Sequence, residues 1–564
     1  MLSNGKIKKQ IYLLGTMIAV LLSCVIFTKR EEMAKQAAAE AYHQEHSYFE
    51  DIKFCGSTDE LQGVRLFEVY YGYYFVFLPG ELFGSVSVDF SQFQELCLGS
   101  EVYRSGDQVN GIVQEVPYTI TAKGWDGSSI EEGVVVFYYG LGLPSVYVES
   151  ESGSLETVNN DREVKEKGKF SIVDEQGKKD SSGNCTIHTR GNSSFQVPQK
   201  SYSFNIDSES SLLGMSPCSE WTLLANFKDS THQLKNKMVL DIAKEIGMPY
   251  TPENHFVNLY VDGQYNGVYL LAQKVSADGG SVKIHDLKAE NEMTMAAGIS
   301  PEHITGGYLL EFDARYEKEP TWFQTKRTNI VVKTPKEIYE EQYEYISSYM
   351  QEVEDAVFSE DGTNAVTGKS YEEYIDTETW TRMYLMQDFF VQWDVEFASF
   401  YLYKDLDDPK IYAGPVWDFD LAFGTLYHGE YPDVTRTTRW IKQRGGWLGK
   451  LASHEEFNSD VEQKYQALLI PALEQYLEEE IETIVNSYRA SMYMSSTRWQ
   501  LGYWDVDSQK QELVSWVGDR MQFMQNYLEN PELYEKVTAE YEWGKIPYYV
   551  LKSEEETMQS LPYN

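Results

Sequence analysis

The stretch Pro415-Val416-Trp417-Asp418-Phe419-Asp420-Leu421-Ala422-Phe423-Gly424 places two carboxylates on alternate residues of an apolar run. If the run is extended, both carboxylates point to the same side, because successive side chains of a strand alternate between its faces. Two such oxygen donors facing a cleft suit Mg²⁺. A third aspartate, Asp394, lies a short distance earlier in the chain. The pattern is typical of a site for phosphoryl transfer.

The length and charge of the chain limit what it can be. Its 564 residues are too many for one ordinary core and predict two or three packed units. The chain has 88 acidic and 48 basic side chains, which gives a formal net charge of -40. Because this charge repels a phosphate backbone, we expect no nucleic acid among the partners.

An uncharged apolar segment lies near the start of the chain and follows several lysines. It predicts a membrane-inserted segment over residues 11–28, with residues 1–10 as a basic cytoplasmic N-terminus. The segment could be an uncleaved anchor, a cleaved signal peptide or a lipoprotein signal ending at Cys24. Apolar and basic residues after Cys24 favour the anchor, so we expect the rest of the chain to be extracytoplasmic, at the cell surface.

The cysteines exclude some metal and redox motifs. No two of them form a Cys-x-x-Cys pair, which excludes a zinc knuckle and a thioredoxin-type motif. Outside the cell Cys55 could pair with Cys97, but buried free thiols explain these residues equally well.

Changes in composition along the chain predict the order of its parts. Residues 29–49 are rich in Ala, Glu, Lys and Gln and predict a helical stalk. Residues 50–142 contain short aromatic and β-branched runs between turn residues, which predicts a small all-β domain of the sandwich type. A second β-rich region begins at residue 143, and helical patterns predominate from about Tyr339 onward. Residues 230–247 have apolar side chains four apart and predict a helix within the β-rich part.

Several motifs keep a common order from about residue 143 to residue 425. They are Leu143-Pro144-Ser145-Val146-Tyr147, Arg190-Gly191-Asn192-Ser193-Ser194, Lys200-Ser201-Tyr202, Trp221-Thr222-Leu223-Leu224-Ala225-Asn226, Leu234-Lys235-Asn236-Lys237, Gly267-Val268-Tyr269-Leu270-Leu271, Gly306-Gly307-Tyr308-Leu309-Leu310-Glu311 and the Trp417–Gly424 run. As a set they resemble the CotH kinase family, named for spore coat protein H, an atypical relative of protein kinases.

The resemblance implies an α+β fold over residues 143–545, with a β-rich lobe followed by a mainly helical lobe. Residues 546–564 would form a C-terminal tail. The implied activity is transfer of the γ-phosphoryl group of ATP, with Mg²⁺, to Ser or Thr of a surface or spore-coat protein.

The resemblance also implies where the phosphates of ATP would bind. Arg190, Gly191, Asn192 and Ser193 would form a turn over the phosphates, where glycine lets backbone N–H groups approach the oxygens and arginine supplies charge. Lys200 would be the catalytic strand lysine that contacts the α- and β-phosphates.

The remaining implied site residues come from both halves of the domain. Asp394 would orient the hydroxyl nucleophile and Asp418 would bind Mg²⁺, with Asp420 as a further metal ligand. Asn226 and Glu311 would line the cleft or support it.

Besides Lys235, which stands where arginine is usual, two positions depart from the family pattern. Ser399 stands five residues after Asp394, where a kinase-type loop has an asparagine for a second metal ion, and a hydroxyl is the poorer ligand. Gln273 stands where we expect a glutamate, and an amide could hydrogen-bond the strand lysine without pairing its charge. These departures keep a catalytically degenerate kinase fold open, acting as a surface module that binds a protein or a cell-wall polymer.

Other enzyme classes have less support. The carboxylates, with 42 tyrosines and 12 tryptophans, would also suit a glycosidase that acts on cell-wall polysaccharide. No His-x-x-x-His spacing supports a zinc hydrolase, and no Gly-x-Ser-x-Gly supports an α/β-hydrolase.

Overall fold

The computed structural model describes residues 47–56, 63–82, 86–191, 193–227, 234–392, 394–423, 441, 446–501 and 505–530. The predicted cytoplasmic start, the membrane segment, nearly all of the stalk and the C-terminal tail lie outside these residues. Within the described ranges, no helix combines the length and the apolar character needed to cross a membrane.

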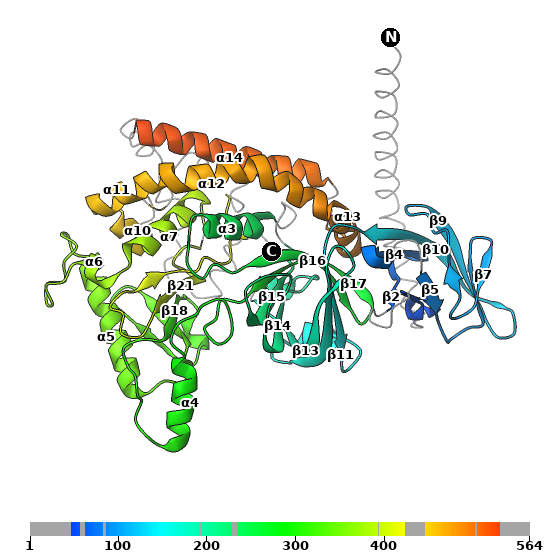
Figure 1. The fold of residues 1–564 in the computed structure, drawn as a ribbon, viewed down its shortest axis with the longest axis horizontal. Helices are drawn as coiled ribbons and strands as arrows, with labels where there is room; N and C mark the ends of the chain where they lie inside the picture. The colour runs from blue at the N-terminus through cyan, green and yellow to red at the C-terminus, as the bar shows by residue number, and fades with distance from the viewer. Residues whose placement is uncertain are drawn as a thin grey trace, which may run out of the picture.

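The N-terminal region consists of two β-sheets that share one hydrophobic core (Figure 1). Its elements are η1 (Tyr48–Asp51), β1 (Lys53–Cys55), β2 (Val64–Arg65), β3 (Phe67–Tyr70), β4 (Tyr73–Pro79), η2 (Gly80–Leu82), β5 (Val86–Asp89), β6 (Glu95–Leu98), β7 (Glu101–Tyr103), β8 (Gln108–Val109), β9 (Pro117–Lys123) and β10 (Ser129–Gly140). The strand orders are β2-β1-β5-β8 and β3-β4-β10-β9-β6-β7. Phe54 of the first sheet packs edge-on against Phe137 of the second, with ring centroids 5.1 Å apart. The aromatic runs of the sequence thus fill the space between the sheets.

The two cysteines that could pair in this region lie in different sheets. Cys55 belongs to β1 and Cys97 to β6, and both are free thiols. Cys185 and Cys218, farther along the chain, are buried free thiols. The described cysteines therefore contribute as small apolar side chains rather than as crosslinks.

A closed barrel follows and forms the first, β-rich lobe. Its strand order is β11-β12-β13-β14-β15-β17-β16. Its elements are β11 (Ser145–Ser150), α2 (Glu156–Asn160), β12 (Glu166–Val173), β13 (Lys179–Thr189), η3 (Ser193–Gln196), β14 (Tyr202–Ser210), β15 (Cys218–Leu224), α3 (Leu234–Glu245), β16 (Asn254–Val261) and β17 (Gln264–Gln273). Thr189 of β13 pairs with Tyr202 of β14, and the Arg190 N–H donates to the Ser201 carbonyl at 2.9 Å. The end of this hairpin therefore carries the turn that begins at Arg190.

The N-terminal sheets and the barrel are joined by a common core. Tyr260 and Tyr265, on neighbouring barrel strands, are buried in the core of the N-terminal sheets. The Tyr260 hydroxyl donates to the Phe77 carbonyl at 3.0 Å, and the Tyr265 hydroxyl to the Ser491 carbonyl at 3.1 Å. Gly142 has φ +96°, and a Cβ there would lie 2.5 Å from the Ser487 carbonyl oxygen. The boundary that composition suggested at residue 142 therefore divides two units that pack tightly together.

The second lobe combines helices with a sheet. Its elements are α4 (Leu287–Ala297), β18 (Tyr308–Phe312), η4 (Tyr316–Lys318), β19 (Trp322–Gln324), β20 (Asn329–Thr334), α5 (Glu340–Val357), α6 (Tyr371–Tyr374), α7 (Thr377–Phe389), β21 (Phe400–Lys404), β22 (Tyr412–Ala413), α10 (Gly446–Leu451), α11 (Glu455–Lys464), η6 (Tyr465–Leu469), α12 (Ile470–Gln475), η7 (Tyr476–Glu480), α13 (Ile481–Trp499) and α14 (Val506–Glu529). The predicted α+β class is confirmed. The helical lobe, however, also contains a 5-stranded sheet of order β19-β20-β18-β21-β22. It was missed because β18 and β21 are far apart in the chain and pair only in the folded protein.

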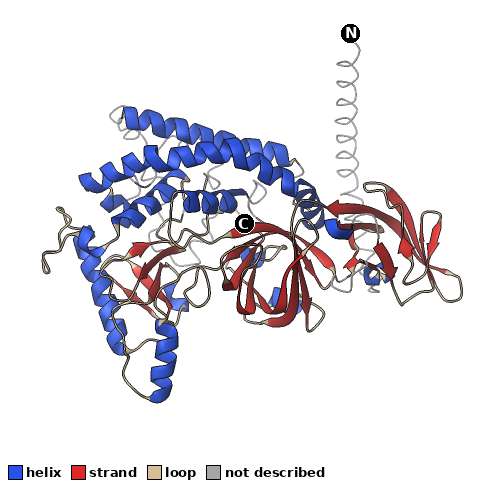
Figure 2. Ribbon diagram, viewed as in Figure 1, coloured by secondary structure: helices blue, strands red, loops and turns tan. Residues whose placement is uncertain are grey.

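Long helices cover one side of the barrel and of the five-stranded sheet of the second lobe (Figure 2). The helical segments from Glu455 to Trp499 follow one another directly, and α14 lies beside them. In α13, Ser495 accepts a hydrogen bond from the Val268 N–H of β17 at 3.1 Å. These helices therefore link the second lobe back to the barrel.

A buried ion pair fixes the end of α7. Asp388 and Arg520 have fully buried side chains, with a nitrogen-to-oxygen distance of 3.7 Å. The Asp388 carboxylate also accepts from the Ile441 N–H at 2.7 Å and from the Tyr465 hydroxyl at 2.6 Å. Arg520 donates to the carbonyls of Asp388 at 2.7 Å and Phe389 at 3.0 Å. These bonds compensate the desolvation of both charges and join α14 to the C-terminal end of α7.

We expect Arg520→Met to lower the free energy of unfolding by about 3–5 kcal/mol, because it leaves the Asp388 carboxylate buried without its counter-charge. Urea unfolding followed by tryptophan fluorescence measures the loss. The control is Arg489→Met, which breaks a solvent-exposed pair with Asp507. That change should cost no more than about 1 kcal/mol. Equal losses in the two variants would contradict the role assigned to Arg520.

Candidate active site

Two loops of the second lobe meet around Asp418. The first, residues 391–399, joins α7 to β21, and the second, residues 414–423, follows β22. The Gln392 amide donates to the Asp418 carbonyl at 2.7 Å, and the Ser399 hydroxyl lies 3.3 Å from the Asp418 carboxylate. Asp418 itself is exposed to solvent. An accessible carboxylate is thus oriented by the neighbouring loop.

Strained backbone concentrates at the same place. Non-glycine residues with positive φ at the site are Asn226 (46°), Val391 (52°), Glu396 (61°), Ser399 (56°), Asp418 (66°) and Phe423 (61°). A β-branched residue such as Val391 is a marked outlier in this region. Such conformations persist only where the surrounding structure enforces them, and they cluster at functional sites. The backbone therefore makes these loops a candidate functional site independently of any motif.

The run around Asp418 is not extended, so the expectation that Asp418 and Asp420 share one side of a strand is wrong. The positive φ of Asp418 turns the chain, and a turn follows in which the Ala422 N–H donates to the Phe419 carbonyl at 3.2 Å. Asp420 is half-buried, whereas Asp418 is exposed. The two carboxylates therefore have different surroundings despite their spacing.

Helix α3 of the first lobe contacts the Asp418 loop directly. The Asn236 side chain accepts from the Phe419 N–H at 2.8 Å and donates to the Asn226 side-chain oxygen at 3.0 Å. The Nδ2 atom of Asn226 is shielded from solvent and has no hydrogen-bond partner among the described residues. Asn226 thus lies at the site with an unused donor. Asn236 received no role from the sequence, although it belongs to a family motif.

Glu311 of β18 contacts the loop that carries Ser399. Its carboxylate, 5% exposed, accepts from the Ser399 N–H at 2.8 Å and pairs with Lys333 at 3.0 Å. Burial raises the pKa of Glu311. Burial alone would lower the pKa of Lys333, but the charges of Glu311 and Glu319 outweigh it and raise that pKa. Glu311 therefore positions Ser399 rather than lining an open cleft.

The turn from the barrel approaches the Asp418 loop. The Arg190 guanidinium lies 5.3 Å from the centroid of the Trp417 ring, which directly precedes Asp418. Burial, followed by the charge of Glu311, raises the pKa of the nearby Tyr401, and both Arg190 and Asp418 also act on that phenol. The first lobe thus contributes a cation beside Trp417, the residue that precedes Asp418.

A comparison with protein families agrees with this placement. The model described as CotH kinase protein matches residues 187–524, which is more than half of the 564-residue chain. The chain belongs to the CotH kinase family. No curated protein matches it. The CotH match includes the Arg190 turn and both loops of the second lobe, but it begins inside β13, after the N-terminal sheets.

In this CotH protein the predicted phosphate turn is partly described. Gly191 has φ +86°, and a Cβ there would lie 1.9 Å from the Ser194 hydroxyl, so the turn requires glycine. Asn192 and the side chain of Ser193 lie outside the described residues.

Lys200 is directed toward its own turn. Its ammonium donates to the Phe195 carbonyl at 2.5 Å and lies 4.9 Å from the centroid of the Phe195 ring. Burial lowers the pKa of Lys200. In the described part of the chain Lys200 has no carboxylate partner. Besides the bond to the Phe195 carbonyl, the ammonium has two further N–H donors that phosphate oxygens could accept.

Gln273 does not occupy the position that the resemblance suggested. Its amide donates to the Ser216 carbonyl at 2.9 Å and accepts from the Glu253 N–H at 3.0 Å. It pairs across the sheet with Trp221, whereas Tyr202, near Lys200, pairs with Leu223 farther along the same strand. Gln273 is therefore a structural residue and is not placed to orient Lys200.

Asp394 and Glu396 lie in the first loop. Asp394 is half-buried, and its carbonyl accepts from the Phe397 N–H at 2.9 Å, which closes a turn. The Glu396 carboxylate accepts from the N–H groups of Trp447 at 2.9 Å and Leu448 at 2.8 Å. Glu396 therefore caps the start of α10. Local sequence could not reveal this, because the capped helix is distant in the chain.

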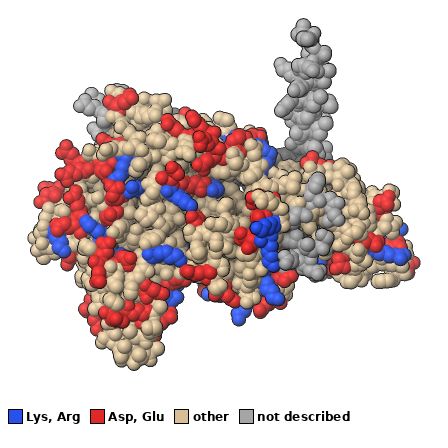
Figure 3. Space-filling model, viewed as in Figure 1, with Lys and Arg blue, Asp and Glu red and all other residues tan. Residues whose placement is uncertain are grey.

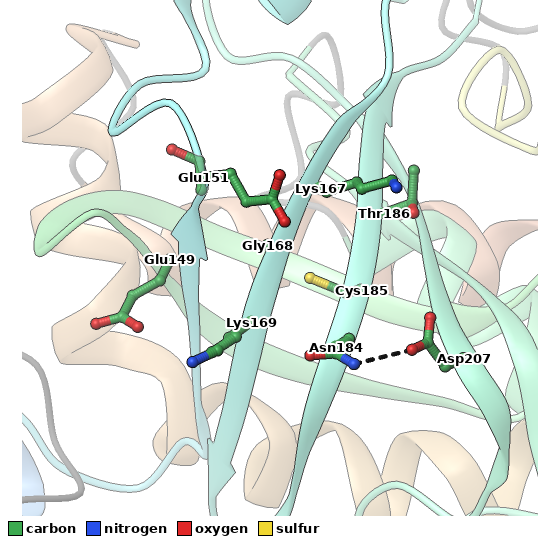
Figure 4. A pocket seen from close by; sticks show the side chains of 10 residues that line it. Glu149, Glu151, Lys167, Gly168, Lys169, Asn184, Cys185, Thr186 and Asp207 are labelled. Atoms are coloured by element: carbon green, nitrogen blue, oxygen red, sulfur yellow. Dashed lines mark hydrogen bonds between the residues drawn. The ribbon is translucent and has the colours of Figure 1, made fainter.

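A cavity of about 410 Å³ lies on the barrel, but none of the predicted site residues lines it. Its lining comes from short runs of consecutive residues at β11, β12 and β13 and from Asp207 of β14, and it includes the charged side chains of Glu149, Lys167 and Lys169 (Figure 4). These side chains face away from the apolar barrel interior. Burial raises the pKa of the Cys185 thiol at its floor to about 12, so this thiol is a poor nucleophile. The cavity carries both charge signs and no catalytic group.

We expect Glu396→Ala to lower the free energy of unfolding by about 0.5–2 kcal/mol, the usual effect of losing a helix cap. The control is Glu474→Ala, which changes an exposed residue of α12 and should stay within about 0.5 kcal/mol. Urea unfolding measures both variants. A Glu396→Ala protein as stable as the control would show that the two hydrogen bonds to α10 do not stabilise the loop.

Proposed function

We propose that this CotH-family protein transfers the γ-phosphoryl group of ATP, with Mg²⁺, to a Ser or Thr hydroxyl of a surface or spore-coat protein. The observation that carries the proposal is the exposed Asp418 carboxylate, which Gln392 and Ser399 of the neighbouring loop orient. Arg190 lies beside the ring of Trp417, the residue before Asp418. Phosphoryl transfer needs mainly positioning and charge neutralisation, which such an arrangement supplies.

The donor set suits Mg²⁺. Asp418 offers a carboxylate, and the Ser399 hydroxyl oxygen lies 3.3 Å from it. Both are hard oxygen donors, the type that Mg²⁺ prefers. When bound, Mg²⁺ would neutralise charge on the β- and γ-phosphate oxygens. Asp394 and Asp420 belong to the same two loops and are the further candidate ligands.

The first lobe would bind the phosphates. Arg190 supplies a guanidinium that can bind phosphate oxygens in a bidentate manner, and the Gly191 backbone leaves room for their approach. Acidic side chains cover much of the visible surface of the molecule (Figure 3). Against this background, the cations Arg190 and Lys200 would direct an anionic ligand to this turn.

Asp394 would orient the acceptor hydroxyl and accept its proton as the oxygen attacks phosphorus. Its loop is joined to Asp418 through Gln392, so the group that positions the nucleophile and the metal ligand would move together. Glu311 and Asn236 would act through the backbone of Ser399 and Phe419, and are positioning residues.

We also propose that residues 11–28 anchor the protein in the membrane and that its domains are extracytoplasmic. The uncharged segment after several lysines supports this orientation. The acceptor would then be a protein of the cell surface.

A second candidate is a surface module that binds a protein or a cell-wall polymer without catalysis. Lys200 favours it, because its ammonium donates to the Phe195 carbonyl and not to a carboxylate of the described residues. Ser399 in place of the kinase asparagine agrees with it, because a neutral hydroxyl is a weak ligand for a second metal ion.

Calorimetry of the full chain with ATP and Mg²⁺ tests the proposal, using Asp418→Asn. Asparagine tolerates the left-handed backbone of Asp418, φ 66°, so the variant removes charge without adding strain. We expect magnesium-dependent ATP binding to be lost, and phosphate transfer to fall by about 100-fold or more. The matched control is Asp407→Asn, at a left-handed aspartate outside the site, φ 55°.

The outcomes separate the two candidate functions. ATP binding in the wild type and in Asp407→Asn, but not in Asp418→Asn, would support the kinase. Unchanged binding in Asp418→Asn would remove Asp418 from the site. Absence of ATP binding in the wild type would favour the surface module.

A further inference from the structure

Three side chains with metal-binding groups meet at the base of α4. The His285 Nε2 atom lies 3.0 Å from a carboxylate oxygen of Glu290, and the His303 Nδ1 atom lies 2.8 Å from the same oxygen. One ligand atom from each of the three residues lies within 4.8 Å of the other two. His285 and His303 flank α4, and Glu290 lies in its first turns, so the three residues lack the short spacing of a metal motif on one helix.

We propose that His285, Glu290 and His303 bind a divalent cation of the zinc class. Two imidazole nitrogens with one carboxylate oxygen form a donor set that Zn²⁺ accepts, whereas Mg²⁺ and Ca²⁺ prefer oxygen ligands alone. The side chains of the three residues are 30%, 10% and 35% exposed, respectively. Water can therefore provide the fourth ligand of a tetrahedral site.

Contacts of the backbone and of Glu290 place the three ligands in advance. The backbone N–H of His285 donates to the Asp405 carboxylate at 2.8 Å. The backbone N–H of His303 donates to the second Glu290 oxygen at 2.8 Å, and the His303 carbonyl accepts from the Gln342 amide at 2.9 Å. A site whose ligands are already oriented loses little conformational entropy when the cation binds.

Close packing beside His285 adds to this order. Gly307 has φ +91°, and a Cβ there would lie 2.8 Å from the His285 carbonyl oxygen. The glycine therefore lets the chain that returns from His303 pass directly against the first ligand.

A metal crosslink here would stabilise α4, which is weakly packed. It projects from the body of the second lobe (Figure 1), and its buried side chains are Leu287, Asn291 and Thr294. Met293 on the helix is 70% exposed, and Ile299 just after it is 58% exposed. A cation would join His285, before the helix, to His303, beyond it, and so close the loop that contains α4.

The electrostatic surroundings also favour a cation. Glu302 and Asp407 act on the His303 imidazole, in addition to Glu290. The Asp405 carboxylate accepts the His285 N–H. Acidic groups therefore surround the two imidazoles, in a chain that is already strongly negative.

The proposed metal site is separate from the candidate active site. Tyr308 pairs with Lys404 at one end of β18 and β21, and Phe312 pairs with Phe400 at the other. The histidines lie near the first end, whereas Ser399 directly precedes Phe400 at the second. A test of one site therefore does not depend on the other.

The experiment is a Zn²⁺ titration of the metal-free full chain, with a chromophoric chelator as competitor. Wild type is compared with Glu290→Gln, with His303→Gln and with the control Glu292→Gln, an exposed carboxylate of the same helix. We expect one tight equivalent in the wild type and the control. Each ligand variant should lose Zn²⁺ affinity by at least roughly 10- to 100-fold. Removal of a residue that only supports a metal ligand already has an effect of that size.

Cobalt provides a readout that is independent of affinity. Co²⁺ bound to the wild type should give the intense visible bands of tetrahedral coordination without a thiolate charge-transfer band. Zn²⁺ should raise the Tm of the wild type and of Glu292→Gln, and leave that of both ligand variants unchanged. Circular dichroism of the metal-free variants establishes that they are folded.

The proposal is overturned if the wild type takes up no tight equivalent, because the three residues are then only a hydrogen-bonded cluster. It is also overturned if Glu290→Gln and His303→Gln, both folded, bind Zn²⁺ as tightly as the control does. Should Glu290→Gln fail to fold, His303→Gln decides the outcome, because it keeps the contact between Glu290 and His285.

Discussion

The buried charge of Asp388 is the constraint on which the second lobe depends. A carboxylate without solvent must be paired and hydrogen-bonded, and here the partners come from Arg520, Tyr465 and the backbone of Ile441. Because these partners lie on different segments, satisfying one charge fixes the relative position of α7, α14 and the helical segment around Tyr465. The loop that begins at Val391 starts directly after this junction, and its unusual backbone conformation is supported there.

In the first lobe, packing between domains fixes the position of the barrel. The N-terminal sheets, the barrel and α13 meet at Tyr260 and Tyr265, whose hydroxyl groups donate to the carbonyls of Phe77 and Ser491. The barrel is therefore held between the N-terminal sheets and the long helices. Its Arg190 turn and helix α3 consequently approach the second lobe in a defined orientation.

The candidate active site divides its chemistry between the lobes. Arg190 and Lys200 come from the barrel side, and the carboxylates of Asp394, Asp418 and Asp420 come from the second lobe. The part of the chain that matches the CotH kinase family, residues 187–524, includes all of these residues. The bond from Lys200 to the Phe195 carbonyl holds the ammonium at this turn, and its other N–H donors could serve phosphate oxygens.

The sequence alone determined the features that depend on short-range patterns. The apolar spacing of residues 230–247 predicted a helix, and α3 occupies Leu234–Glu245. The ordered motifs predicted the family. Arg190 and Asp418 were named from the resemblance, and in the fold Arg190 lies beside Trp417, the residue that precedes Asp418. The active roles of these residues stay predictions.

Only the tertiary structure decided the contacts between distant residues. Asn236 accepts from the Phe419 N–H, Glu396 caps α10, and His285 meets His303 at Glu290. The left-handed backbone at Asp418 likewise has no local signal, because aspartate adopts this conformation more readily than most residues but adopts extended and helical conformations far more often. Periodicity is set within a few residues of the chain, whereas these features arise from the path of the whole chain, which brings together groups that no local pattern connects.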